Sequence, residues 1–135
     1  MTQEENTNNV IIAKYMGATI EKGWENSDNP MYHFETKPSF HPDHWTTHNY
    51  SADYMLYCCS WDWAMPVLEQ ISTLNLRHYS ASYEITQGRC VIYIKHIAYT
   101  MPVETIEVED KETIKAAYRA IIEFILWYNE AKNQN

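Results

Sequence analysis

The feature that most constrains the fold is an apolar stripe near the end of the sequence, within residues 111–131. Apolar residues recur there at the i, i+3, i+4, i+7 spacing of one helical face. The stripe consists of Ile114, Ala117, Tyr118, Ile121, Ile122, Ile125 and Tyr128. We therefore predict a long amphipathic helix here, with Asp110 and Glu112 where acidic residues favour a helix N-terminus.

Alternating residues upstream of this helix predict an antiparallel hairpin. Residues 80–86 alternate in polarity and residues 89–98 are rich in β-branched residues, with Gln87 and Gly88 as a tight turn between them. Shorter strands are expected at residues 18–20, 31–35 and 54–58, and a last one at residues 105–108. Strands joined by hairpins favour an antiparallel or mixed sheet.

Two further helices are expected before the hairpin. Asn8 or Asn9 can cap a short helix over residues 10–16. The second helix begins within CCSWDWAMP, residues 58–66, and runs to about residue 74. Pro66 favours Asp62 as its N-cap, with Ser60 as the competing cap, and Trp61 is then expected to point toward the sheet.

The predicted fold class is α+β, with three helices and one sheet of about four to six strands. A chain of 135 residues, 45% of them hydrophobic, fits a single domain over residues 1–135. Residues 1–8 are polar and are expected to form a flexible N-terminus. Residues 36–53 contain two Pro and three His without any period, and they are expected to form a long loop or insertion.

Composition and charge exclude several classes of partner. The net charge is −8, so binding to a nucleic-acid backbone, which depends on Lys and Arg, is not expected. The N-terminus lacks the pattern of a signal peptide and no apolar run is long enough for a membrane span. Cys58 and Cys59 are adjacent, which is poor disulfide geometry, so we expect reduced, structural thiols there and at Cys90, in a cytoplasm.

Three segments resemble a family of small phage and prophage proteins, the phage α/β/α-sandwich domain group. They are the start IIAKYMG at residues 11–17, the segment SWDWAMPVLEQI at residues 60–71, and the Ala-rich KAAYRAII at residues 115–122. The resemblance implies a three-layer α/β/α sandwich and an origin in a phage, a prophage or a related element, and hence the cytoplasm of a bacterial host. It brings no active site with it.

The His-rich loop offers the best candidate for a metal site. His41, His44 and His48 are close in sequence and imidazole is a good Zn²⁺ ligand. The alternative is a solvated polar loop, because Pro42 prevents a helix that would stack the three rings and no Cys pair follows. No phosphate-binding loop and no G-x-S-x-G nucleophile motif is present, and the three Gly are isolated.

Two surface features near the end of the chain suggest contacts with a protein. An acidic run that includes Glu107 and Glu109 is either a solvated loop and helix start or a contact face for a basic partner. Phe124 and Trp127 are expected to lie away from the apolar stripe, as a covered helix end or as a self-association surface that gives a homo-oligomer.

Two functional hypotheses follow. The first is a non-enzymatic accessory protein of a phage or prophage, with no cofactor, acting through protein–protein contacts. The alternative is a small metal-dependent enzyme or metal-binding protein that uses His41, His44 and His48.

Overall fold

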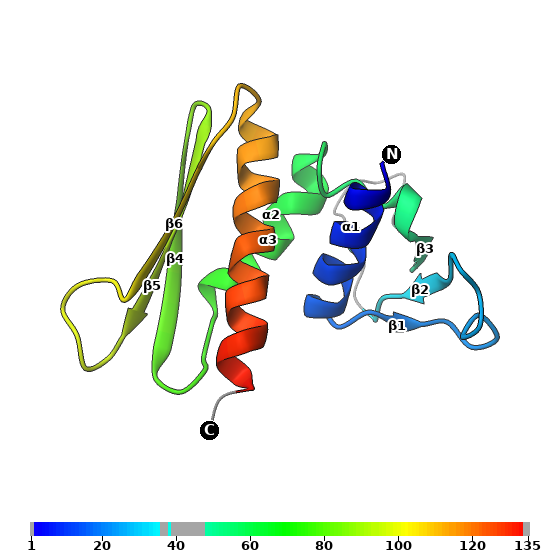
Figure 1. Ribbon diagram of the computed structural model, residues 1–135, viewed down its shortest axis with the longest axis horizontal. Helices are drawn as coiled ribbons and strands as arrows, with labels where there is room; N and C mark the ends of the chain where they lie inside the picture. The colour runs from blue at the N-terminus through cyan, green and yellow to red at the C-terminus, as the bar shows by residue number, and fades with distance from the viewer. Residues whose placement is uncertain (1, 36–37, 39–47, 134–135) are drawn as a thin grey trace. The chain divides into compact units, whose positions relative to one another are not determined.

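Figure 1 shows the computed structural model of the chain, which describes residues 2–35, 38 and 48–133. The chain forms two compact units, Met1–Pro66 and Val67–Asn135. The described residues contain three α-helices, and every pair of strands among them is antiparallel. The α+β class expected from the sequence is therefore confirmed.

The first unit combines one helix with a small antiparallel sheet in the order β1-β2-β3. Its elements are α1 (Gln3–Tyr15), β1 (Thr19–Ile20), β2 (Met31–His33), β3 (Asn49–Ser51) and the short 3-10 helix η2 (Ala52–Tyr54). The strands are only two or three residues long. Strands this short depend on side-chain packing more than on their backbone ladder.

Helix α1 begins earlier than residue 10, because Thr2 caps it. The Thr2 hydroxyl accepts a hydrogen bond from the Glu5 backbone N–H at 3.0 Å, and the Glu5 carboxylate accepts one from the Thr2 N–H at 3.2 Å. This reciprocal pair satisfies two backbone donors that a helix start leaves free. The predicted cap at Asn8 or Asn9 was wrong, and the segment expected to be flexible belongs to α1 from Gln3 onward.

Asn9 instead joins α1 to the turn after β3. Its side chain is fully buried, and its Nδ2 donates to the carbonyl oxygens of Ala52 at 2.9 Å and Met55 at 3.1 Å. Burial of a side-chain amide destabilises the fold unless its polar atoms form hydrogen bonds. The interaction explains why an Asn is accommodated in the middle of a helix.

Helix α2 (Trp61–Ser72) starts directly after Ser60, so the preference for Asp62 as the cap was wrong. The carbonyl oxygen of Ser60 accepts from the N–H groups of Trp63 at 3.1 Å and Ala64 at 3.0 Å. Asp62 thus lies in the first turn, and Pro66 is accommodated inside the helix.

The two indoles of α2 also exchange the roles expected of them. Trp63 is fully buried, with its ring edge-to-face against Tyr50 at 4.9 Å and Tyr57 at 5.1 Å between centroids. Trp61 is 38% exposed, so it is not the apolar anchor. The strand predicted at residues 54–58 is also absent from the described chain, which forms η2 and then a turn there.

The predicted loop at residues 36–53 falls largely outside the described residues, which omit 36–37 and 39–47. Its last part is regular, since residues 49–51 form β3 and Ala52 begins η2.

The second unit packs a long helix on a three-stranded sheet. Its elements after α2 are β4 (Tyr79–Thr86), β5 (Arg89–His96), β6 (Glu104–Glu109) and α3 (Thr113–Lys132). The predicted hairpin is confirmed, because Thr86 pairs with Arg89 across Gln87 and Gly88. The sheet order is β4-β5-β6.

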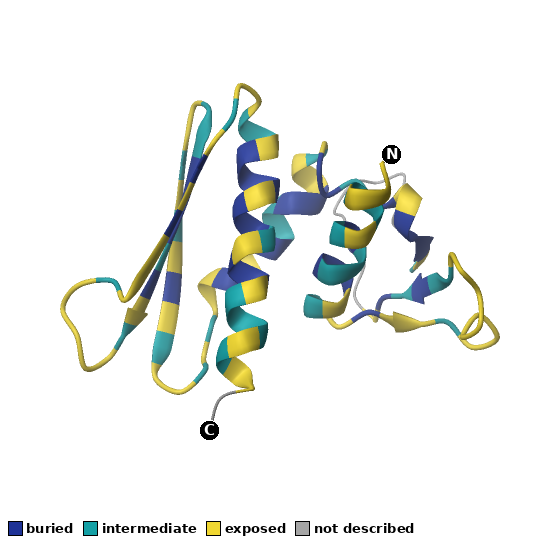
Figure 2. Ribbon diagram, viewed as in Figure 1, coloured by how far each residue is buried: buried dark blue, intermediate teal, exposed yellow. Residues whose placement is uncertain are grey.

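Helix α3 lies along this sheet and contacts β5 and β6 more than β4 (Figure 1). Figure 2 shows buried stretches along α3 and in the middle of β5. Cys90, Ile92 and Ile94 of β5 are fully buried, and so are Ile121 and Ile125 of α3. Each fully buried aliphatic side chain contributes roughly 1.5–3 kcal/mol, so this contact is a main source of stability in the unit.

The described strands thus form two sheets of three, whereas a single sheet of four to six strands was expected. The three-layer arrangement and the single domain stay predictions. None of the helices in the described ranges combines the length and the apolar character that a bilayer crossing requires.

Candidate functional site

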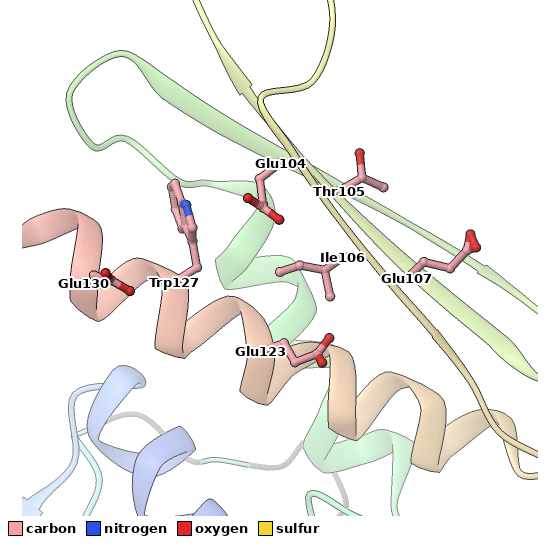
Figure 3. Close-up of a pocket in the computed structure, with 7 residues that line it drawn as sticks. All are labelled: Glu104, Thr105, Ile106, Glu107, Glu123, Trp127 and Glu130. Atoms are coloured by element: carbon pink, nitrogen blue, oxygen red, sulfur yellow. The ribbon is translucent and has the colours of Figure 1, made fainter.

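The second unit carries an acidic groove between strand β6 and helix α3. It has a volume of about 390 Å³. Its lining residues, shown in Figure 3, are Glu104, Thr105, Ile106, Glu107, Glu123, Trp127 and Glu130.

Two periodicities bring these side chains together. Consecutive residues of a strand point to opposite faces, so Glu104 and Ile106 point toward α3 while Thr105 and Glu107 point away from it (Figure 3). Glu123, Trp127 and Glu130 are separated by four and three residues, which places them on one face of a helix. The groove is therefore formed where these two faces meet.

The carboxylates of the groove differ in their partners. Glu107 accepts a hydrogen bond from Nη2 of Arg89 at 2.8 Å, and this contact holds the pKa of Glu107 below its usual range. Glu104, Glu123 and Glu130 are exposed and make no ion pair within the described part of the chain. Like charges that lack counter-ions create a negative potential, which attracts a cation.

Trp127 supplies an aromatic wall to the groove. It is partly exposed, and its ring packs edge-to-face against Tyr79 with centroids 5.3 Å apart and an interplanar angle of 85°. The Phe124 ring lies 5.8 Å away on the same helix. An indole held in this way keeps a fixed orientation, and its π-face attracts ammonium and guanidinium groups.

Strand β6 is also an edge of the sheet. Among the described strands it pairs only with β5, so the backbone groups along its other side have no strand partner. An open edge of this kind is a template for an additional strand. The groove lies along residues 104–107, which are the first part of the open edge formed by Glu104–Glu109.

The residues predicted as partner contacts lie in different environments. Glu107 and Trp127 line the groove, and Glu109 is exposed on β6 without lining it. Phe124 is fully buried, which fits the alternative of a covered helix end rather than a contact surface. Glu123 and Glu130 were missed, although their spacing from Trp127 was a usable signal in the sequence.

The predicted metal ligands are only partly described. His41 and His44 lie outside the described residues, so the metal site stays a prediction. His48 stacks against His33 with centroids 6.2 Å apart, and its Nδ1 lies 2.9 Å from the Phe34 carbonyl oxygen. That oxygen only accepts, so Nδ1 carries the hydrogen and Nε2 keeps its lone pair. Within the described ranges, no three His, Cys, Asp or Glu residues form a metal-binding group.

Two of the three thiols show the chemistry of a protein interior rather than of a reactive centre. Cys58 and Cys90 are buried, and burial raises their pKa to about 12 and about 11, respectively. Thiols of this kind form little of the nucleophilic thiolate near neutral pH. Cys59 is exposed.

Comparison of the chain with protein-family models, with curated proteins and with solved structures finds no match.

Proposed function

We propose that this protein is a non-enzymatic binding module that takes an extended, Lys- or Arg-containing segment of another protein at the β6 edge. The observation that carries the proposal is the convergence of Glu104, Glu123 and Glu130 around Trp127, beside a strand edge that no other described strand pairs with. The net charge of −8 favours the same class of partner at longer range.

The groove accounts for the choice of a cationic side chain. A Lys or Arg that enters it meets the indole of Trp127 and three carboxylates that have no ion pair among the described residues. Hydrogen bonds between such cations and carboxylates are stronger than neutral ones, and the aromatic ring adds a cation–π interaction.

The strand edge accounts for the choice of an extended segment. A peptide that adds to β6 gains backbone hydrogen bonds that do not depend on its sequence. Its side chains then alternate, so every second one points to the α3 side, as Glu104 and Ile106 do. Specificity arises from which of those side chains is cationic.

A peptide titration tests the proposal. The probe is a fluorescent peptide in which Lys and Val alternate, compared by anisotropy with the same peptide carrying Glu in place of Lys. We expect binding of the cationic peptide only, with an affinity that falls as salt is added. Methylation of alternate backbone nitrogens should abolish binding, because it removes the donors that pair with β6.

Two double variants with the same change in net charge test whether the peptide binds at the groove. Glu104→Gln with Glu123→Gln is expected to weaken binding about tenfold, for two charged contacts of roughly 0.7 kcal/mol each. Glu4→Gln with Asp28→Asn changes the net charge equally, in the first unit, and should leave the affinity unchanged. Equal losses in the two variants would mean that only the overall charge matters, and the groove would then not be the site.

The wider role rests on the sequence resemblance alone. We propose an accessory protein of a phage or prophage because residues 11–17, 60–71 and 115–122 resemble that family. Gene neighbourhood and capture of partners from the native host test this role.

Zinc binding is a second candidate, favoured by one observation. The His48 ring donates through Nδ1 to a backbone carbonyl, which is the arrangement that orients His ligands of metals and leaves Nε2 available. His41 and His44 are the proposed partners. Elemental analysis of untagged protein tests it, and a content below about a tenth of a metal per chain would exclude a resident ion.

A further inference from the structure

A second cavity of the same unit has the opposite chemical character. It lies at the end of the β4–β5 pair, where Tyr79 is opposite His96, and has a volume of about 530 Å³. Its polar lining includes Asn75, His78, Lys95 and His96, and none of the described side chains that line it is acidic. In a chain with a net charge of −8, such a surface is unusual.

The backbone beside this cavity is strained at the two residues that precede β4. Arg77 and His78 have φ angles of +50° and +70°, in the left-handed region that residues with a Cβ rarely adopt. The conformation is fixed by a hydrogen bond from the Ile97 N–H to the His78 carbonyl oxygen at 3.1 Å. Strain that is held by the surrounding structure is often found at functional sites.

The tautomer of His96 follows from one hydrogen bond. The Ala98 N–H donates to Nδ1 of His96 at 3.0 Å, so this nitrogen bears a lone pair and the hydrogen of the neutral ring is on Nε2. The ring is also held by Tyr79, with centroids 4.9 Å apart, and by Tyr99 at 5.6 Å. His96 thus acts as a fixed hydrogen-bond donor.

Lys95 provides the positive charge. It is exposed and makes no ion pair within the described part of the chain. Because Lys95 and His96 are consecutive residues of β5, their side chains start from opposite faces of the strand, so Lys95 adds its charge at the rim of the cavity. The fixed imidazole N–H of His96 and the amide of Asn75 are suited to hydrogen bonds with an anionic group such as phosphate or carboxylate.

Aromatic rings form another part of the surface. His78, Tyr79 and Tyr99 all contact the ring of His96, and Tyr99 is 64% exposed, so its ring is open to a ligand. Flat ligands stack on such rings. The volume also lies in the range of small-molecule sites.

We propose that this cavity binds a small anion that carries a planar ring, with the His96 N–H at the anionic group, the charge of Lys95 at the rim and Tyr99 at the ring. The site is independent of the acidic groove, which selects cations.

Titration of the full chain, followed by amide chemical shifts, tests the inference. The probes are 5′-AMP and phenyl phosphate, compared with adenosine, phenol and inorganic phosphate. We expect both aromatic anions to shift the amides of Tyr79, His96 and Tyr99, and to bind at least about tenfold more tightly than any of the three fragments. Equal binding of a fragment, shifts confined to other regions, or no binding of either anion would overturn the proposal.

Two variants and one control test the assigned contacts. Lys95→Gln should weaken binding of 5′-AMP about threefold, as expected for an exposed charge. Lys111→Gln removes the same charge beyond the opposite end of β6 and should bind as the unmodified chain does. His78→Asn should also weaken binding, and it keeps a residue type that tolerates the left-handed conformation. Unchanged affinity of Lys95→Gln, with preserved amide dispersion, contradicts the assignment.

Discussion

Trp127 and Tyr79 meet edge-to-face, with ring centroids 5.3 Å apart and an interplanar angle of 85°. Trp127 lines the acidic groove, and Tyr79 lines the cavity at the end of β4 and β5. This single aromatic contact thus separates a surface suited to cations from one suited to anions. The fixed indole also forms the apolar part of the groove, which leads to a first prediction.

Trp127→Ala should weaken binding of the alternating Lys–Val peptide by about tenfold, through loss of the aromatic wall and its cation–π interaction. Anisotropy titration measures the change. Trp24→Ala is the control, because Trp24 is 42% exposed in the first unit and lines no part of the groove. Retained affinity in Trp127→Ala would remove the indole from the proposed site.

The carboxylates of the groove should contribute unequally. Glu107 is already paired with Arg89 at 2.8 Å, whereas Glu104 has no ion pair in the described chain. We therefore expect Glu104→Gln to weaken peptide binding about threefold and Glu107→Gln to have a smaller effect. The same titration compares them. A larger loss for Glu107→Gln would indicate that the peptide binds on the outer face of β6.

The parts of the fold that the sequence predicts are those with strong local signals. The hairpin at Gln87 and Gly88 combines alternation with a turn residue, and Gly88 does adopt a positive φ of +74°. The long helix was predicted from its period, which is independent of what covers it. The start of α1 was missed because the capping box of Thr2 and Glu5 lies within a polar segment.

The errors near α2 have a tertiary cause. Ser60 and Asp62 are both acceptable caps, and the choice is made by burial of Trp63 between Tyr50 and Tyr57. Those ring contacts link residues that are up to thirteen positions apart, so no local pattern reveals them.

The candidate site was predicted in part, because small residues obscured the buried face of α3. Ala116, Ala120 and Phe124 are all fully buried and follow one another at intervals of four residues. Since Ala carries little weight in an apolar pattern, the stripe was centred too far from Phe124. Once the buried face of α3 is centred nearer Phe124, Glu123 and Glu130 lie beside Trp127 on the side of the helix that lines the groove.

Asn9→Ala should destabilise the first unit by about 1–3 kcal/mol, because the carbonyl groups of Ala52 and Met55 lose a buried donor. Urea unfolding measures the loss. Asn8→Ala removes the same amide from a neighbouring, partly exposed position of α1 and should be neutral or slightly stabilising, given the helix propensity of Ala. Similar losses in both variants would argue against the buried hydrogen bonds.

Gly88→Ala should reduce the stability of the second unit by at least about 1 kcal/mol. A Cβ at this position lies 3.1 Å from the carbonyl oxygen of Asp110, in addition to the strain of a positive φ. Gly17→Ala is a matched control, with φ of +89° and nothing within 4 Å of the added Cβ. Thermal unfolding should show the larger loss for Gly88→Ala, and the reverse order would argue against a close approach at the hairpin.

The three thiols should differ in reactivity, and their differences should set an alkaline limit to stability. At pH 8 the exposed Cys59 should react with a disulfide reagent at once, while Cys58 and Cys90 should react only as the chain opens. Cys59→Ser should abolish the fast phase.

Burial raises the pKa of Cys58 to about 12 and of Cys90 to about 11, whereas the pKa of an unfolded thiol is about 8.5. Above that lower value the unfolded chain releases protons that the folded chain retains, so stability should be complete below about pH 8.5 and decline as the pH rises toward 11. Urea midpoints between pH 7 and 10 measure this decline. Cys90→Ala should reduce the slope, because only the remaining groups with raised pKa then contribute. A pH-independent midpoint together with fast reaction of all three thiols would show that Cys58 and Cys90 are accessible to solvent.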